Sequence, residues 1–214
     1  MAISTYTELL TAGSNWLGGR TDLTSRFPEF VVLCEAKLNR ELFVRQMETR
    51  STTSCDTTDT EPEFISLPTD FQSMRRVRLS SVSGKPRLKF LNGTQADEYR
   101  YGQGNSAAQP AYFTIMGSEM ELIPTPDSNF TIEMVYRKNI PALVTNSTNW
   151  LLTLAPDVYL YGMLLESAPY IKEDERIQVW ASGFSQALQS LNSLGQLAQY
   201  NSGPMTISVS GATP

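Results

Sequence analysis

APDVYLYGMLLESAPYI (residues 155–171) predicts an α-helix whose apolar side chains cover nearly every face. Pro156 and Asp157 suit its first turn, because the proline φ is already helical and the acid complements the helix dipole. Pro169 lacks the backbone N–H that would continue the helix, so we expect the helix to break there. A helix that is apolar all round has to be buried on all sides. The rest of the chain must therefore surround it.

Helical patterns at both ends of the chain supply the expected neighbours. The first covers residues 5–17, where Thr5 and Glu8 have the spacing of a capping box. The second covers residues 27–48, with apolar side chains at steps of three and four. The last starts near Asp174 and ends near residue 200. We expect these helices to wrap the central one as a bundle of about four.

Between residues 63 and 138 the apolar period changes from 3.6 to 2, which predicts short strands joined by tight turns. Phe130, Ile132 and Met134 alternate with more polar neighbours, as in a sheet with one buried face. We expect an antiparallel β module with a short helix at Thr94–Tyr101. The preceding stretch, Thr49–Thr60, fits either a linker or an exposed edge strand.

The predicted fold class is therefore α+β: a helical bundle from both chain ends, an inserted antiparallel β module and an extended C-terminal arm. The predicted segments are 1–48 and 141–200 for the bundle, 49–140 for the β domain and 201–214 for the arm. Met205, Ile207 and Val209 alternate along the arm as in a strand. The arm is either a frayed end or a segment that adds to another chain as a partner-binding strand.

The composition limits the chemistry of the chain. Among 214 residues there is no histidine, which excludes Ser-His-Asp and Cys-His catalysis. Cys34 and Cys55 are too few and too isolated for a disulfide framework or a metal site. No catalytic, cofactor or metal-binding residue is predicted, and a carboxylate hydrolase is retained only as a third hypothesis. The N-terminus lacks a signal-peptide pattern and no apolar run could span a bilayer, so we expect a protein of the cytosol without membrane contact.

Two short motifs have simpler explanations than a ligand site. Gly102, Gly104 and Ala107 match a dinucleotide-binding spacing, but no buried strand precedes them and Pro110 follows. Consecutive acids at residues 173–175 point in different directions on a helix and suit its first turn. We interpret the first motif as a flexible loop and the second as helix capping.

A basic hairpin, residues 75–89, stands out from an otherwise acidic chain. It contains six positive side chains and no acid: Arg75, Arg76, Arg78, Lys85, Arg87 and Lys89. Removing these six from the 17 basic residues leaves 11 against 22 acidic ones. Alternation with Val77, Leu79 and Leu88 places the charges on the outer face of the hairpin. The face is a solvated surface, a docking site for an acidic protein or a nucleic-acid-binding module, and the sequence leaves all three open.

Three stretches resemble the head-to-tail adaptor (connector) proteins of short-tailed bacteriophages. They are FPEFVVLCEAKLNRELFVRQME, LPTDFQSMRRVRL and NWLLTLAPDVYLYGMLLESAPYIKEDERIQVW. The resemblance runs in order from Thr5 to about Tyr200, and the last stretch is the most specific.

The resemblance implies a structural virion protein and no enzyme. Its copies would form a homo-oligomeric, dodecameric ring in the neck between capsid and tail, assembled in the host cytoplasm. Such a ring binds the portal protein, extends the channel through which DNA passes without sequence-specific binding, and offers a platform to tail or nozzle proteins. In that family the C-terminal arm reaches toward the portal.

Overall fold

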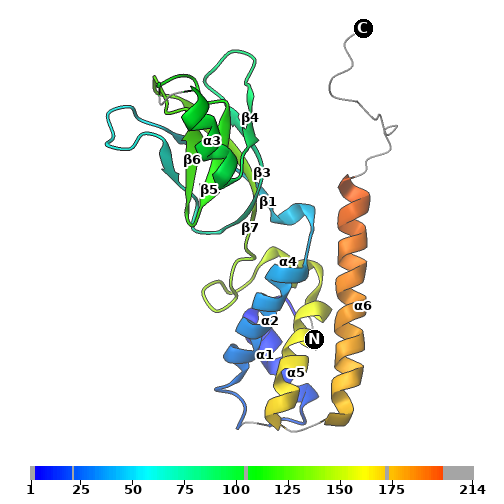
Figure 1. Ribbon diagram of the computed structural model, residues 1–214. Coiled ribbons are helices and arrows are strands. Elements are labelled where there is room, and N and C mark those ends of the chain that lie inside the picture. Colours follow the sequence, from blue (N-terminus) through cyan, green and yellow to red (C-terminus); the bar gives the residue numbers. More distant parts are fainter. Residues whose placement is uncertain (1–2, 21, 104–105, 172–173, 200–214) are drawn as a thin grey trace. The chain divides into compact units, whose positions relative to one another are not determined.

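The computed structural model describes residues 3–20, 22–103, 106–171 and 174–199, which form two compact units (Figure 1). The helical unit comprises the described residues of Met1–Gln46 and Ile140–Pro214, and the β unit is Met47–Asn139. Six α-helices and one seven-stranded sheet lie within the described residues. The α+β class predicted from the sequence is thus confirmed.

The helical unit begins with α1 (Tyr6–Trp16) and α2 (Phe27–Glu41). Thr5 and Glu8 form the predicted capping box at the start of α1. The predicted continuation of the second helix to residue 48 is wrong. The Asn192 side chain accepts a hydrogen bond from the Phe43 N–H at 2.8 Å and donates one to the Glu41 carbonyl at 3.1 Å, and so caps α2 from a distant helix.

The C-terminal half of the unit contains α4 (Trp150–Leu154), α5 (Pro156–Ile171) and α6 (Asp174–Gln199). Because the backbone leaves the helical region at Ala155, α4 and α5 are separate, and the unit has five helices within the described residues rather than about four. The break predicted at Pro169 is also wrong. Pro169 lies inside α5, two residues before its end, where its φ is helical and only one backbone hydrogen bond is lost.

The almost wholly apolar helix α5 packs against α1, α2, α4 and α6 (Figure 1). Val158, Tyr159, Met163 and Leu164 are fully buried. Gly162 permits a close approach of α2 and α6, because a Cβ there would meet the Cys34 sulfur and the Phe184 ring. The surroundings that the sequence demanded are therefore supplied by helices from both ends of the chain.

One buried carboxylate, Glu35 on α2, is held by neutral donors. Its Oε1 accepts hydrogen bonds from the Leu143 N–H at 2.9 Å and the Tyr159 hydroxyl at 3.3 Å. Asn149 donates to the same tyrosine hydroxyl at 2.7 Å and caps α4 through Leu152 N–H. Burial raises the pKa of Glu35, and these bonds offset only part of that effect. The Glu35 carboxylate is thus hydrogen-bonded within the unit.

The β unit is a curled seven-stranded sheet in the order β1-β7-β3-β4-β5-β6-β2 (Figure 1). The strands are β1 (Glu48–Ser54), β2 (Phe64–Ser66), β3 (Phe71–Leu79), β4 (Arg87–Phe90), β5 (Tyr112–Met116), β6 (Glu119–Ile123) and β7 (Thr131–Lys138). The stretch from Thr49 contributes β1 at one edge of the sheet, so the edge-strand alternative was the right one for residues 48–54.

The prediction of a wholly antiparallel module is corrected by one pair of strands. β4 and β5 run parallel, with Lys89 opposite Tyr112 and Phe90 opposite Phe113. The predicted short helix is present between them as α3 (Gly93–Gln103), which packs against β5. A helical crossover of this kind brings the chain back to the same end of the sheet, and so makes the next strand parallel. The sheet is therefore mixed.

Candidate protein-binding surface

The hairpin of β3 and β4 carries all six predicted cations. Gly84 (φ 76°) and Lys85 (φ 45°) lie in its turn, one of the tight turns expected between the short strands. Leu79 and Leu88 are buried in the core of the β unit, which leaves Arg87 and Lys89 exposed on the other side of β4. The alternation that placed these charges on an outer face therefore matches the structure.

An irregularity in β3 exposes two consecutive arginines. The register between β3 and β7 shifts between Met74 and Arg76, so that Arg75 is an extra residue on β3. Met74 and Val77 consequently face the same core although they are three residues apart. Arg75 and Arg76 are both exposed on the opposite side. Simple alternation along the strand does not predict this arrangement.

A buried acid from β7 lies among the arginines. The Glu133 side chain is only 3% exposed, and Arg78 approaches its carboxylate oxygens at 2.7 and 2.9 Å. Arg50 of β1 lies 3.1 Å from it and Arg76 lies 3.7 Å from it. The hydrogen bond from Arg78 is the main reason why the pKa of Glu133 is lowered, and Arg50 adds to the effect. The three guanidinium groups share one negative charge.

Sequence reasoning missed Glu133 because the acid is 55 residues from Arg78 along the chain. Its alternation in β7 did place it on the more polar face. What the sequence lacked was the strand order, which puts β7 between β1 and β3. A second acid, Glu48, accepts a hydrogen bond from Arg75 at 3.0 Å. The positive charge of the hairpin is therefore partly neutralised by acids from β1 and β7.

Two cations of β4 are left over after this pairing. Within the described residues, no ion pair involves Arg87 or Lys89. Arg87 also lies directly opposite Arg78 on β3, an arrangement of like charges that is unfavourable without a compensating anion. The positive charge of this face is thus in excess of its acids.

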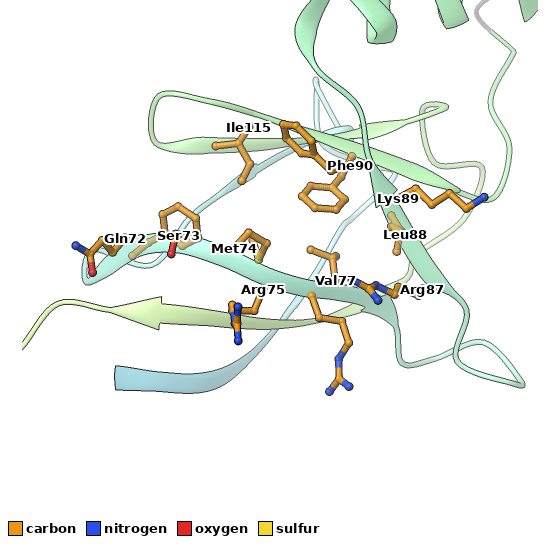
Figure 2. A pocket seen from close by; sticks show the side chains of 13 residues that line it. Gln72, Ser73, Met74, Arg75, Val77, Arg87, Leu88, Lys89, Phe90 and Ile115 are labelled. Carbon is orange, nitrogen blue, oxygen red and sulfur yellow. The ribbon is translucent and has the colours of Figure 1, made fainter. Parts of the chain in front are cut away.

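A groove of about 760 Å³ opens between β3 and β5 beside these cations (Figure 2). Figure 2 shows Met74, Phe90 and Ile115 around the same space, with Lys89 extending outward at one end. The Phe90 ring is 58% exposed and packs edge-on against Phe113, with 5.6 Å between the ring centroids. The lining residues are Phe71–Val77, Arg87–Phe90, Phe113 and Ile115. An apolar floor is therefore open to solvent next to unpaired positive charge.

The other predicted contact residues, Met205, Ile207 and Val209, lie outside the described residues. Of the two motifs set aside, Gly104 and Glu173 also lie outside them, while Gly102 belongs to α3. Both cysteines are buried free thiols, and burial raises the pKa of Cys34. That thiol stays protonated and is a poor nucleophile.

Neither a metal site nor a membrane span is found in the part of the chain that the structure describes. No group of three or more Cys, Asp or Glu side chains there could hold a metal ion. Likewise, none of the described helices is long and apolar enough to cross a membrane.

Comparison with known protein families gives one match, to a family described as "SU10 adaptor protein", over residues 4–208. No curated protein matches the chain. The match spans both units and includes residues 75–89 and the positions of Met205 and Ile207.

Proposed function

This chain belongs to the SU10 adaptor protein family, a family of phage head-tail adaptors, and on that premise we propose that it builds a ring between the portal and the tail. Membership implies a structural role in the neck of a phage particle, with portal and tail proteins as partners. The ring, its dodecameric symmetry and its assembly in the host cytoplasm are parts of the proposal. The observation that carries the proposal is the family match over nearly the whole chain.

The helical unit is suited to be the wall of such a ring. Its buried carboxylate, Glu35, is hydrogen-bonded by the Leu143 amide and the Tyr159 hydroxyl of the same unit, so that charge needs no ligand. Several apolar side chains on its surface remain exposed, among them Val32, Leu33 and Val179. Packing of these side chains against the next copy would remove apolar area from water. A contact between two different faces of neighbouring copies closes into a ring when the rotation between the copies allows it.

The β unit is suited to meet other proteins. Its hairpin cations outnumber the acids that pair with them, and an acidic neighbouring surface would compensate the excess. The arm, residues 201–214, would bind the portal through Met205, Ile207 and Val209. The ring would then lengthen the DNA channel and give tail proteins a platform, without base-specific contacts of its own.

Mixing the purified chain with portal rings tests this proposal. We expect a complex that elutes earlier than either component in size-exclusion chromatography and appears as a second ring in electron micrographs. A chain truncated after residue 200 should associate more weakly, and the Tyr101→Phe variant, altered at a fully solvated side chain, should behave as wild type. Absence of a complex at every salt and protein concentration would contradict an adaptor role.

A nucleic-acid-binding module remains the competing proposal, supported by Arg87 and Lys89. It predicts duplex affinity that falls steeply with salt, and a salt slope reduced by about 1 for each phosphate contact removed. Arg87→Ala and Lys89→Ala are the informative variants, because Arg78 is engaged by the buried Glu133 and its removal would disturb the sheet. Weak binding that these changes leave unaltered would exclude the module.

A further inference from the structure

The groove of the β unit exists because β4 ends early. After Phe90 the chain turns into α3, where the Asn92 side chain accepts from the Gln95 N–H at 2.8 Å and Gln95 bonds back to the Asn92 N–H at 3.2 Å. This reciprocal cap fixes the start of the helix only two residues after the strand. The local sequence therefore prevents β4 from continuing along its neighbours.

Both neighbouring strands continue where β4 stops. Pairing of β3 with β4 covers only Val77 and Arg78, and β3 extends beyond it through residues 71–76. Pairing of β5 with β4 ends at Phe113, and β5 extends through residues 114–116. Since β4 is antiparallel to β3 and parallel to β5, its extrapolated path lies between these two extensions. The groove thus lies on the path that a longer β4 would take.

The two sides of this vacant position differ in chemistry. The inner side is apolar, because Met74, Phe90 and Ile115 leave an edge of the β core open. Arg87 and Lys89 of β4 line the same groove, and none of the described groove-lining residues is acidic. A strand placed there would turn alternate side chains toward the apolar floor and the remaining ones toward the cations.

We infer that this groove binds an extended segment of a partner protein, added as a strand in line with β4, with apolar side chains at alternate positions and carboxylates between them. Backbone pairing would supply affinity, and the two sets of side chains would supply specificity. The inference rests on the proposed function, because the partner would be a neighbouring virion protein.

Charge favours a partner segment over the chain's own arm or a duplex. The arm, NSGPMTISVSGATP, contains no acidic side chain that could face Arg87 and Lys89. A duplex could offer phosphates to these cations but nothing to cover the exposed ring of Phe90. Only an acidic and partly apolar peptide satisfies both sides of the groove.

Fluorescence anisotropy with the full chain and a labelled, end-capped heptapeptide of alternating glutamate and valine tests the inference. We expect saturable binding that weakens as salt rises. A peptide with lysine in place of glutamate loses its attraction to the cations, and a peptide with serine in place of valine loses its apolar contacts with the floor. Each should bind at least about tenfold more weakly. Equal binding of all three peptides would overturn the inference.

Variants of the chain locate the site. Phe90→Ala should weaken binding about tenfold, since it removes an anchor from the floor. Lys89→Glu should weaken it about fivefold or more, whereas Lys85→Glu, the same charge reversal at the hairpin turn outside the groove, should change it less than about twofold. Circular dichroism verifies that each variant is folded. Equal effects at residues 85 and 89 would mean that the peptide is held by general electrostatic attraction, and would overturn the inference that it binds in the groove.

Two competitors separate the remaining occupants. A peptide of residues 201–214 that binds more tightly than the acidic peptide would assign the groove to another copy of this chain and overturn the inference. Displacement of the acidic peptide by a short DNA duplex at a lower concentration would assign the groove to nucleic acid, with the same consequence. Portal association is measured separately, so its persistence without peptide binding would leave the adaptor function intact while rejecting the groove.

Discussion

Glu35 of the helical unit and Glu133 of the β unit are both buried, yet their surroundings are opposite. Glu35 is 6% exposed and accepts hydrogen bonds from an amide and a tyrosine, and its pKa is raised by burial. Glu133 is 3% exposed and lies within 3.7 Å of three arginines, and its pKa is lowered, chiefly by Arg78. The neutral donors around Glu35 offset only part of the cost of burying its charge. The negative charge of Glu133, in contrast, is outnumbered by the positive charges around it.

The difference separates a unit whose buried carboxylate is bonded by neutral groups from a unit with an excess of positive charge. Helices from both ends of the chain enclose α5, and the hydrogen bonds of Glu35 and Tyr159 are made within the unit. The β unit leaves the cations Arg87 and Lys89 without ion-pair partners among the described residues, and leaves an open apolar floor. We infer that the first unit mainly supports structure and the second mainly makes contacts.

The largest effect is expected from breaking the closed helical core. Leu164→Ala, at a fully buried position of α5, should lower the free energy of unfolding by about 2–5 kcal/mol. All three tryptophans, Trp16, Trp150 and Trp180, lie in the helical unit, so urea unfolding followed by tryptophan fluorescence reports on it. Leu154→Ala, the same substitution at a side chain that is 54% exposed, is the matched control. Similar losses from both would contradict an enclosed α5.

Glu35 should show the next largest effect and a distinctive pH dependence. Glu35→Ala leaves the buried Leu143 N–H without its acceptor and should cost about 1–3 kcal/mol. Since the folded state binds the Glu35 proton more tightly, wild-type stability should fall as pH rises from the ordinary glutamate pKa through the raised one. Glu35→Gln keeps an oxygen for the amide and should flatten this dependence. If the Glu35→Gln variant kept the wild-type pH profile of tryptophan-detected unfolding, Glu35 would not be the source of the pH dependence.

Glu133 should respond to pH in the opposite sense and more weakly. The folded state binds its proton less tightly, so the stabilisation is complete above the ordinary glutamate pKa and is lost as pH falls through the lowered one. The effect is limited because the arginines reach water, Arg50 being 67% exposed. Hydrogen exchange of β7 amides, corrected for intrinsic rates, should show less protection in acid. In the Glu133→Gln variant the protection of the β7 amides should no longer fall in acid. If it still falls, other groups cause the loss of protection.

The smallest effect is expected from the longest ion pair. Arg76→Ala should change stability by about 0.5 kcal/mol or less, because the guanidinium is 45% exposed and 3.7 Å from Glu133. Arg78→Ala removes a less exposed partner at 2.7 Å and should have a larger effect on β7 hydrogen exchange. If the two variants were equally destabilising, the three arginines would not differ in their contribution to the site.

Much of the fold was predictable because the relevant patterns are local. The capping box at Thr5, the helix at α3, the turn at Gly84 and the all-round burial of α5 each depend on residues within a few positions of one another. One error, the end of the second helix, arose because a distant segment intervenes. Asn192 of α6 caps α2, which ends at Glu41. The division of the chain into four segments stays a prediction.

The sequence by itself determined which side chains have to be buried, which strand face is basic and which family the chain resembles. Only the tertiary structure decided that β7 carries Glu133 into the arginines, that β4 and β5 are parallel, and that a groove lies beside Phe90. The physical reason is that period and capping act between neighbours along the chain, whereas strand order and charge pairing depend on segments brought together only by folding.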